Sequence, residues 1–364
     1  MRIAVIGGST AGLASALRLR QSGHEVSVFE RRPGTNTGGF GLLLTPSARQ
    51  GLQRLGVHQD SMGYSVEQSD IRDADGRSIL SQGLHDTVGI ERAELQNALL
   101  ASLEPGILHQ GKSFLGFESD QQGVARAAIF SDGTRVEADL FIGADGVRSK
   151  VRSSWTPGPA LRQVQSVELV GKYRGDGIPE LLNGRFLKYC RTGEGISIGL
   201  VPTSTGSVTW YIQCDPQRWP MIFSPQQEKL AWLREEVKKW PDPVAEIILG
   251  SDLNQTHLWR TTDRDLPSCF HRRNVLLVGD AAHPLLTFTS QGTGSAIEDA
   301  LAIGDLLDHH VSRAPEPELL DGIFCEFSRF RIPILRARLQ MGRRMQSQFL
   351  NPTRRTQQIV PICS

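Results

Sequence analysis

The 364-residue sequence has no excess of charge and no long hydrophobic run. Its 40 Lys and Arg residues balance 39 Asp and Glu residues, whereas nucleic-acid-binding surfaces usually carry a basic excess. No apolar run approaches the roughly 18 residues that a membrane-spanning helix needs. The first apolar run, Ile3–Ile6, leads directly into a glycine-rich loop, unlike a signal peptide. We therefore expect no nucleic-acid partner and no stable membrane association.

Cysteine is also scarce. The sequence has five cysteines, which are Cys190, Cys214, Cys269, Cys325 and Cys363. They are odd in number and form no CxxC pair, so the spacing predicts neither a zinc site nor a disulfide framework. We expect no metal, and a reducing compartment, the cytoplasm, as the location.

The composition is otherwise that of an ordinary globular protein. Hydrophobic residues make up 39% of the chain and charged residues 22%, which is enough apolar material for sizeable cores. The length favours about two domains. No internal repeats or low-complexity segments are present.

The first thirty residues carry the strongest local pattern. A buried strand is predicted at Ile3–Ile6, a glycine-rich turn at Gly7–Gly12, a helix at Leu13–Gln21 and a second strand at His24–Glu30. This order is typical of a dinucleotide-binding βαβ unit, in which a pyrophosphate meets the N-terminus of the helix. A glycine-rich turn that binds nothing is the alternative.

Each position in this unit has a physical role. Gly7 permits the tight turn, Gly12 lets the helix pack closely on the strand, and Glu30 accepts hydrogen bonds from the ribose hydroxyls. Ser9 replaces the usual second glycine, and its hydroxyl could donate to a phosphate. The cofactor-binding residues predicted in this unit are Gly7, Gly8, Ser9, Thr10, Ala11, Gly12, Glu30 and Arg31.

The middle of the chain changes character. Residues 164–214 are rich in β-branched and aromatic residues and predict an antiparallel sheet. Asp75-Gly76 and Asp132-Gly133 predict hairpin turns, residues 90–103 predict a helix, and Ser224-Pro225 predicts the start of another with a capping box. We interpret the middle region as a second domain inserted into the first.

The C-terminal third returns to the nucleotide-binding pattern. A buried strand, Asn274–Val278, ends in Gly279-Asp280, and Gln291–Gly294 precedes a helix over residues 295–309. The last fifty residues predict an Arg-rich amphipathic helix that covers the protein with a solvated basic face. We prefer this interpretation to a membrane anchor, since the segment has no strong aromatic stripe.

Three separated motifs together resemble the single-component FAD-dependent aromatic hydroxylases, the group A flavoprotein monooxygenases that include para-hydroxybenzoate hydroxylase. The first motif is the N-terminal unit. The second, Asp145–Arg152, is similar to the family's D-G-x-x-S-x-x-R segment, and the third begins at Gly279–Pro284 with the sequence GDAAHP. The resemblance spans nearly the whole chain in the right order.

The resemblance implies an α/β fold: a Rossmann-like FAD-binding domain, an inserted antiparallel-sheet substrate domain and a C-terminal helical segment. The implied boundaries are 1–65, 88–160 and 268–345 for the FAD-binding domain, 66–87 and 161–267 for the substrate domain, and 346–364 for the tail. It also implies an enzyme that uses FAD, NADH or NADPH as a transient reductant, and O2. Such an enzyme hydroxylates a small aromatic or heteroaromatic substrate through a flavin C4a-hydroperoxide.

The family's FAD contacts can be carried over residue by residue. Asp145 would lie near the pyrophosphate, Asp280 would contact the ribityl chain, and Arg92 would lie against FAD. Backbone N–H groups of Gly292–Gly294 open a helix and would stabilise negative charge on the reduced flavin. The remaining cofactor-binding residues predicted are Leu42, Arg92, Asp145, Asp280, Gly292, Thr293 and Gly294. Ordinary roles stay open for several: a turn aspartate for Asp145, a cap for Asp280 and a surface ion pair for Arg92.

The family's P-x-x-G-Q-G segment, which lies near the flavin ring in the family, is altered in this sequence. Thr287 replaces the proline and Ser290 replaces the first glycine. The candidate substrate residues are Thr287, Phe288 and Thr289 from this loop and Tyr211 and Gln213 from the predicted sheet. His283 is a candidate for a catalytic base, with a structural role as the alternative. Packing or loop roles remain the alternative for all of them.

Other functions on this fold stay open at the level of sequence. An epoxidase, an N-hydroxylase, a reductase or a non-catalytic FAD-binding module would share the same motifs. The W-x-W-x-I-P segment of flavin halogenases is absent. The substrate, the choice between NADH and NADPH and the oligomeric state are not predicted.

Overall fold

The computed structural model describes residues 1–34, 39–177, 181–310 and 317–351. Residues 352–364 of the predicted tail lie outside the described residues. The first sheet has six strands in the order β18-β19-β12-β1-β2-β8. In that order they are His271–Arg272, Val275–Leu277, Leu140–Gly143, Arg2–Ile6, Glu25–Glu30 and Leu108–Gln110.

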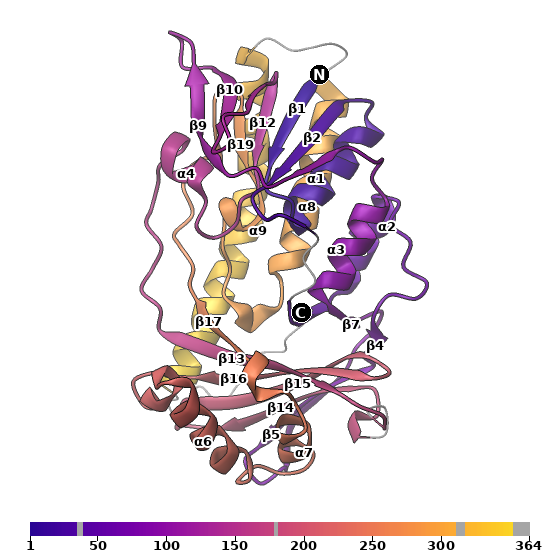
Figure 1. The fold of residues 1–364 in the computed structure, drawn as a ribbon, viewed down its shortest axis with the longest axis vertical. Helices are drawn as coiled ribbons and strands as arrows, with labels where there is room; N and C mark the ends of the chain where they lie inside the picture. The colour runs from indigo at the N-terminus through magenta and orange to yellow at the C-terminus, as the bar shows by residue number, and fades with distance from the viewer. Residues whose placement is uncertain (35–38, 178–180, 311–316, 352–364) are drawn as a thin grey trace.

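The two faces of the first sheet are covered differently (Figure 1). Helix α1 (Thr10–Gln21) joins β1 to β2 and packs against α8 (Gly292–His310), where Arg18 pairs with Asp305 and Asp308. A three-stranded antiparallel sheet and α4 (Lys150–Trp155) supply aromatic rings such as Phe117, which contacts Phe141 of β12. Its strands are β9 (Phe114–Ser119), β10 (Ala125–Phe130) and β11 (Arg135–Glu137). The β1, β12 and β19 side chains are buried on both faces, as their apolar sequences predict.

The carboxyl ends of four neighbouring strands meet at one edge of the first sheet. Strands β2, β1, β12 and β19 are mutually parallel in this order. The segments that leave them begin at Arg31, Gly7, Ala144 and Val278. Because β2 and β12 flank β1, the strand order reverses there, which is where open α/β sheets bind ligands.

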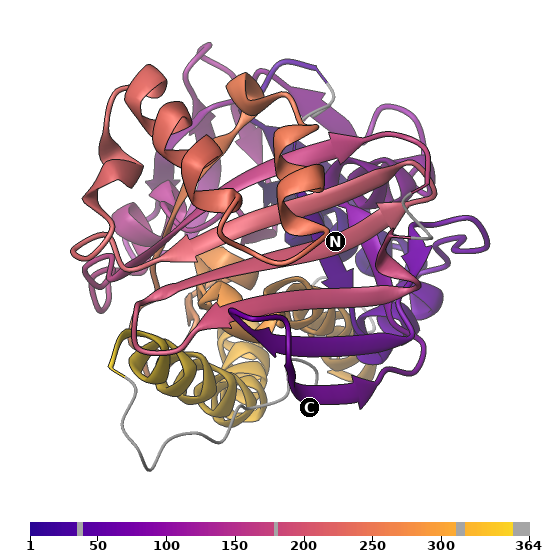
Figure 2. The ribbon, with the colours of Figure 1, turned by 90° about the horizontal axis from the view of Figure 1, so that it is seen from below.

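The second sheet has seven strands in the order β17-β13-β16-β15-β14-β5-β6. In that order they are His257–Thr261, Ser166–Arg174, Ser207–Cys214, Ile196–Ser204, Arg185–Arg191, Gln68–Asp73 and Ser78–Gly83. One face holds Leu169, Trp210 and Ile198, which pack against α6 (Gln226–Val237) and α7 (Val244–Leu249) in a separate apolar core. Figure 2 shows these helices across the sheet. The other face, which carries many polar side chains, is turned toward the first sheet.

Several elements join the two sheets. The short strands β3 (Gly41–Leu44), β7 (Val88–Glu91) and β4 (Tyr64–Ser65) form a three-stranded sheet that contacts β15. Helices α2 (Pro46–Arg54) and α3 (Arg92–Ala101) follow β3 and β7, and α9 (Pro317–Leu350) runs from the first sheet to the second (Figure 1). Gln346 of α9 donates to Ser166 of β13 at 2.9 Å. Short 3₁₀ turns complete the fold: η1 (Pro220–Phe223), η2 (Leu253–Gln255), η3 (Gly279–Ala281) and η4 (Thr287–Thr289).

Most predicted elements are present. The α/β fold class with its helical C-terminal segment is confirmed, and so are the hairpins at Asp75-Gly76 and Asp132-Gly133. The hairpin at Asp132-Gly133 ends at Glu137, because the next strand, Leu140–Gly143, joins the parallel sheet. The domain boundaries stay a prediction. Among the described helices, none combines the length and the apolar character that crossing a bilayer requires.

Three local predictions were wrong. The helix predicted over residues 90–103 begins at Arg92, because Ile90 pairs with Leu42 in a strand. Pro225 lies at the N-cap of α6 rather than inside it, and no side-chain capping bond is made. The basic face of the last helix is only partly solvated: Arg329, Arg336 and Arg344 are exposed, whereas Arg331, Arg338 and Arg343 form ion pairs with other elements.

Candidate active site

The glycine-rich loop after β1 leaves no room for side chains at two positions. A Cβ built on Gly7, whose φ is 114°, would lie 2.3 Å from the Ala144 carbonyl oxygen. A Cβ on Gly12 would lie 1.8 Å from the carbonyl oxygen of Gly7. Both positions therefore require glycine, and the first motif lies directly against the segment that begins the second.

The N-terminus of α1 is left open for a ligand. The first N–H groups of a helix have no intrahelical acceptor, and the exposed Ser9 side chain makes no capping bond to them. Glu30, at the carboxyl end of β2, accepts hydrogen bonds from the N–H groups of Gly8 at 2.8 Å and Arg32 at 3.0 Å. The loop thus presents N–H donors beside an anchored carboxylate, which suits a pyrophosphate and its ribose. Thr10 and Ala11 are buried in the first turn of α1, and Arg31 is exposed after β2.

The second motif connects the other two. Asp145 accepts from Ser149 Oγ and from the N–H groups of Lys150 and Val151, so its carboxylate caps α4. Arg152 donates to the carbonyl oxygens of Ala281 at 2.7 Å and Val147 at 2.6 Å. Burial lowers the pKa of Arg152. The motif therefore holds the third motif in place, and the contact of Asp145 with FAD stays a prediction.

Asp280 carries a carboxylate that can accept hydrogen bonds. Among the residues that the structure describes, none donates a hydrogen bond to its carboxylate. Burial raises its pKa, while the positive charge of Arg92 works in the opposite direction. The Arg92 guanidinium itself lies over the Trp259 ring, 5.6 Å from its centroid. A polyol hydroxyl placed at Asp280 would satisfy this carboxylate.

The N-terminus of α8 faces the same region. Gly292 and Thr293 are half-buried in its first turn, and a Cβ on Gly294 would lie 3.7 Å from the Ala48 side chain. The positive end of the helix dipole suits negative charge there. Ser290 just before it has φ 53°, in the left-handed region that glycine adopts most easily. Leu42, half-buried in β3, pairs with Ile90.

These groups fit FAD. The α1 N-terminus and Glu30 suit its pyrophosphate and ribose, Asp280 suits its ribityl hydroxyls, and the α8 N-terminus suits a negatively charged ring. All four lie at the carboxyl edge of the first sheet or in the segments that leave it.

His283 is held by a buried partner that the sequence did not predict. Its Nε2 lies 2.5 Å from Asp299 Oδ2, and that oxygen also accepts from the Gly279 N–H at 2.8 Å. Asp299 Oδ1 accepts from Arg331 of α9 at 2.8 Å. Burial alone would raise the pKa of Asp299, but the charge of His283 and its hydrogen bond lower it to about 2. A ring that is 1% exposed and paired in this way is placed to hold α8, not to meet a substrate.

The candidate substrate residues meet around a carboxylate that the sequence did not single out. Glu168 of β13 accepts hydrogen bonds from Thr287 Oγ1 and from Gln213 Nε2 through its Oε1 atom. Glu168 is 8% exposed, and burial raises its pKa. The hydrogen bond to Thr287 joins the loop before α8 to the second sheet. A charged residue inside an apolar strand sequence was the available signal.

The other candidate substrate residues, Tyr211, Phe288 and Thr289, each contact different side chains. The Tyr211 ring lies flat over Gly199, where a Cβ would meet it at 2.1 Å. Burial and the nearby charge of Glu168 raise the pKa of Tyr211 well above its ordinary value. Phe288 is buried against Phe349, with ring centroids 5.7 Å apart. Thr289 is buried, and its hydroxyl has no partner among the described atoms.

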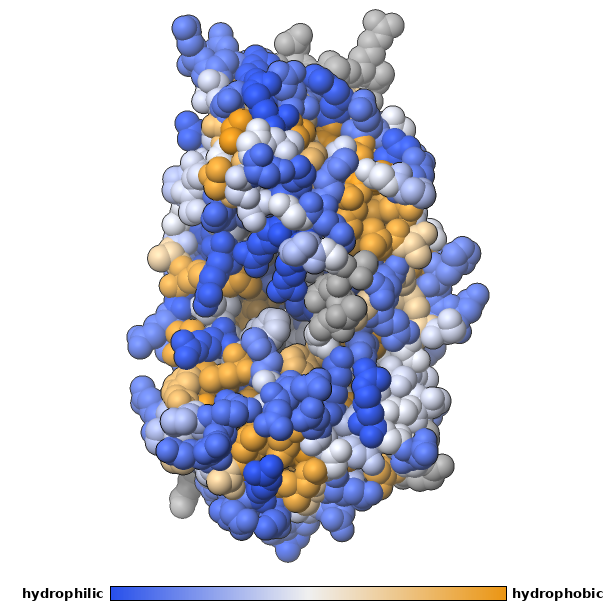
Figure 3. Space-filling model, in the orientation of Figure 1, coloured by the Kyte–Doolittle hydropathy of each residue, from blue (hydrophilic) through white to orange (hydrophobic). Residues whose placement is uncertain are grey.

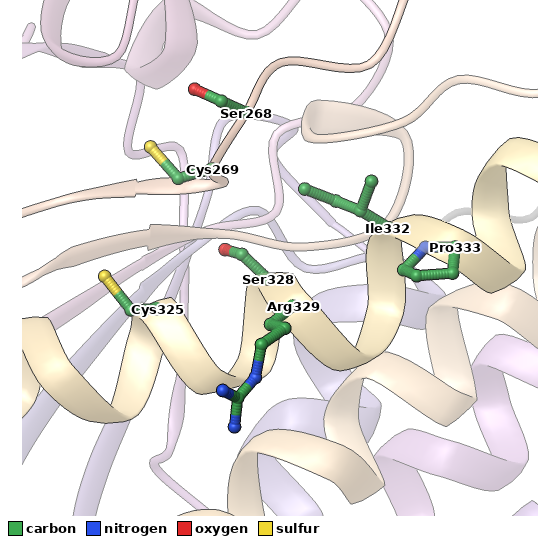
Figure 4. A pocket seen from close by; sticks show the side chains of 7 residues that line it. All are labelled: Ser268, Cys269, Cys325, Ser328, Arg329, Ile332 and Pro333. Atoms are coloured by element: carbon green, nitrogen blue, oxygen red, sulfur yellow. The ribbon is translucent and has the colours of Figure 1, made fainter.

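A separate pocket lies on the outer side of α9. Figure 4 shows Cys269, Cys325 and Arg329 among its lining residues. Beside it, ligand atoms of the buried His271, the half-buried Asp321 and the exposed Cys325 lie within 4.8 Å of one another. The pocket shares no residue with the predicted cofactor or substrate sets. Elsewhere, the surface is recessed between the upper and lower parts of the molecule (Figure 3).

Comparisons with known proteins agree with this geometry. The family model described as an FAD binding domain matches residues 1–326. The chain is 31% identical to a 3-amino-4-hydroxybenzoate 2-monooxygenase of Streptomyces platensis, over 84% of this chain and 79% of the relative. It is 28% identical to a salicylate hydroxylase of Pseudomonas putida, over 84% and 77%.

The fold has close counterparts among solved structures. Klebsiella pneumoniae HpxO, solved with FAD and uric acid, superposes with a TM-score of 0.84 at 23% identity, covering 98% of this chain and 90% of HpxO. The chain therefore belongs to the FAD binding domain family, among the FAD-dependent aromatic monooxygenases.

Proposed function

We propose that this protein hydroxylates a small aromatic or heteroaromatic compound, using NADH or NADPH and O2. One observation carries the proposal. The loop between the third motif and α8 reaches the polar face of the second sheet, where Thr287 bonds to Glu168. The cofactor cradle and this polar sheet face thus border one space, which suits a small ring held next to a flavin.

The proposed reaction balances as substrate plus NAD(P)H, a proton and O2 giving hydroxylated substrate, NAD(P)⁺ and water. When bound, FAD supplies the electron transfer and the activation of oxygen. The chain supplies position and electrostatics. Asp280 accepts from the ribityl chain, and the α8 N-terminus stabilises negative charge in the ring. The two sheets shield the space between them from water.

Glu30 and the α1 N-terminus hold the other end of the cofactor in this proposal. The structure offers one complete dinucleotide-binding unit in its described part, so NAD(P)H binds transiently. We also propose a cytoplasmic location. The unpaired thiols of Cys190, Cys214, Cys269 and Cys325 support it, since a reducing compartment keeps such thiols free.

A spectroscopic experiment tests the proposal. The purified protein is reconstituted with FAD, and its absorbance is followed anaerobically with NADH or NADPH and a panel of phenols, aminobenzoates and hydroxypyridines. We expect a flavin spectrum that is bleached faster when one of these compounds is added. Bound flavin that no reductant bleaches would instead support a non-catalytic FAD-binding module, and failure to bind FAD would overturn the assignment.

A further inference from the structure

The sheet face that borders the proposed active site carries three polar groups with unused bonding capacity. In the described structure Glu168 Oε1 receives both of its hydrogen bonds, from Thr287 and Gln213, and Oε2 receives none. The Tyr211 hydroxyl and the Lys188 ammonium have no hydrogen-bond or ion-pair partner among the described residues. Although Glu168 is only 8% exposed, its Oε2 atom is not among the fully buried unpartnered atoms, so it is accessible and can accept a hydrogen bond from a ligand.

Strand register puts these groups on one face. Lys188 of β14 is opposite Gly199 of β15, which is opposite Tyr211 of β16, and Tyr211 is opposite Val170 of β13. Glu168 is two residues before Val170 and therefore points to the same side. The charge of Lys188 acts on Glu168 without an ion pair between them. The two charged groups are thus near each other without forming an ion pair.

The loop before α8 closes over this space. Thr287 contributes its hydroxyl to Glu168, and the Phe288 ring lies 5.8 Å from Lys188 Nζ. The family's proline at position 287 has no hydroxyl to donate. Thr287 and Glu168 therefore act together. Thr287 and Gln213 hold one oxygen of the Glu168 carboxylate and leave the other oxygen available to the ligand.

We propose that Glu168 and Lys188 select the substrate: an aromatic acid whose ring also carries an amino or hydroxyl group. Glu168 Oε2 accepts a hydrogen bond from the ring substituent, and Lys188 pairs with the acidic group. The small Gly199, which lets the Tyr211 ring lie flat, gives the substrate ring an aromatic surface to stack on. This inference rests on the proposed function and names its substrate class.

Binding to the oxidised, FAD-loaded protein tests the inference without requiring turnover. Dissociation constants for benzoate, 3-aminobenzoate, 3-hydroxybenzoate and aniline are measured from the change in flavin absorbance. The wild-type protein should bind the two substituted benzoates at least about tenfold more tightly than benzoate, which corresponds to about 1.4 kcal/mol.

Two isosteric or near-isosteric variants separate the roles. Glu168→Gln presents an amide N–H where the donor of the substrate lies, so it should remove the preference for substituted benzoates and leave benzoate within about threefold. Lys188→Met should weaken all benzoates about tenfold and leave aniline unchanged. Thr287→Val, which frees one Glu168 oxygen, should lower the preference by a smaller factor. FAD content verifies that each variant is folded.

The outcomes distinguish the inference from the function on which it rests. If Glu168→Gln keeps the wild-type ratio between 3-aminobenzoate and benzoate, the selection by Glu168 is wrong. Should aromatic compounds accelerate NAD(P)H oxidation in that case, the proposed function stands without it. If the loaded wild-type protein responds to no aromatic compound in binding or in reduction, both are overturned.

Discussion

At the scale of single residues, the cofactor loop depends on the absence of side chains. Gly7 and Gly12 each sit where a Cβ would meet a carbonyl oxygen, and Gly7 also has a positive φ. The sequence predicted these two positions from the spacing alone, because the constraint is local. Residue type alone did not predict the backbone at Ser290. This serine replaces the family's glycine and yet adopts φ 53°, in the left-handed region.

Gly12→Ala tests the close approach. Its Cβ would lie 1.8 Å from the Gly7 carbonyl oxygen, so the loop must shift. We expect a loss of FAD content and a destabilisation of about 3 kcal/mol, since overpacking commonly costs 1–3 kcal/mol or more. Retained FAD and the melting temperature of the protein are the measurements. Gly116→Ala in β9 is the matched control, because nothing lies within 4 Å of its Cβ, and it should retain FAD and stability. Equal behaviour of the two variants would contradict the account.

At the scale of secondary-structure elements, one buried ion network holds α8 between its neighbours. Asp299 of α8 bonds to His283, to the Gly279 N–H and to Arg331 of α9. Glu298, also on α8, pairs with Arg331 and Arg338 of α9. The sequence predicted each helix but not this network, because its partners lie 16 to 40 residues apart and only packing brings them together.

Asp299→Asn should destabilise the protein by about 3 kcal/mol, because it removes the negative charge that faces the buried His283 and one of the two carboxylates that pair with the buried Arg331. In the wild-type protein the pKa of Asp299 is about 2, below its ordinary value of 3.8. Its contribution to stability is therefore present above about pH 4 and is lost as the pH falls toward 2, by about 2 kcal/mol. Urea unfolding at several pH values measures both effects.

The matched control for this network is Glu235→Gln, the same chemical change in an exposed pair with Lys238. We expect it to alter the free energy of unfolding by less than about 0.5 kcal/mol. A wild-type stability that does not change between pH 4 and pH 2, relative to Asp299→Asn, would contradict the assigned role of Asp299.

At the scale of the whole molecule, the relation between the two sheets decides the function. The α/β fold and the motifs at the strand ends were predictable, because each depends on a short stretch of sequence. Glu168 was not, since its bond to Thr287 spans 119 residues and joins two sheets. The alternation along a strand shows which residues share a face of the sheet, but it does not show which loop covers that face.

A contact between the three-stranded sheet and the second sheet gives a further prediction. Glu91, at the end of β7, accepts from Lys172 of β13 at 2.7 Å and from Ser207 at 3.1 Å. Burial alone would raise the pKa of Glu91, but the hydrogen bond from Lys172 and its charge outweigh that effect and lower it. Both side chains are less than one fifth exposed.

A double-mutant cycle with Glu91→Gln and Lys172→Met measures this contact. We expect a coupling energy of about 1 kcal/mol in urea unfolding, as is usual for contacting residues. Arg77 and Asp75, an exposed pair within one hairpin, are the control and should couple by less than about 0.5 kcal/mol. Additive effects at Glu91 and Lys172 would show that the pair does not hold the three-stranded sheet to the second sheet.

The most direct test of the central claim is the origin of the inserted oxygen atom. The FAD-loaded protein is supplied with NAD(P)H, an aminobenzoate or hydroxybenzoate that accelerates flavin reduction, and ¹⁸O2, and the product is analysed by mass spectrometry. The account predicts one ¹⁸O atom per hydroxylated product and none when the label is in water. Consumption of O2 that yields only hydrogen peroxide, with no labelled aromatic product from any compound of the panel, would contradict it.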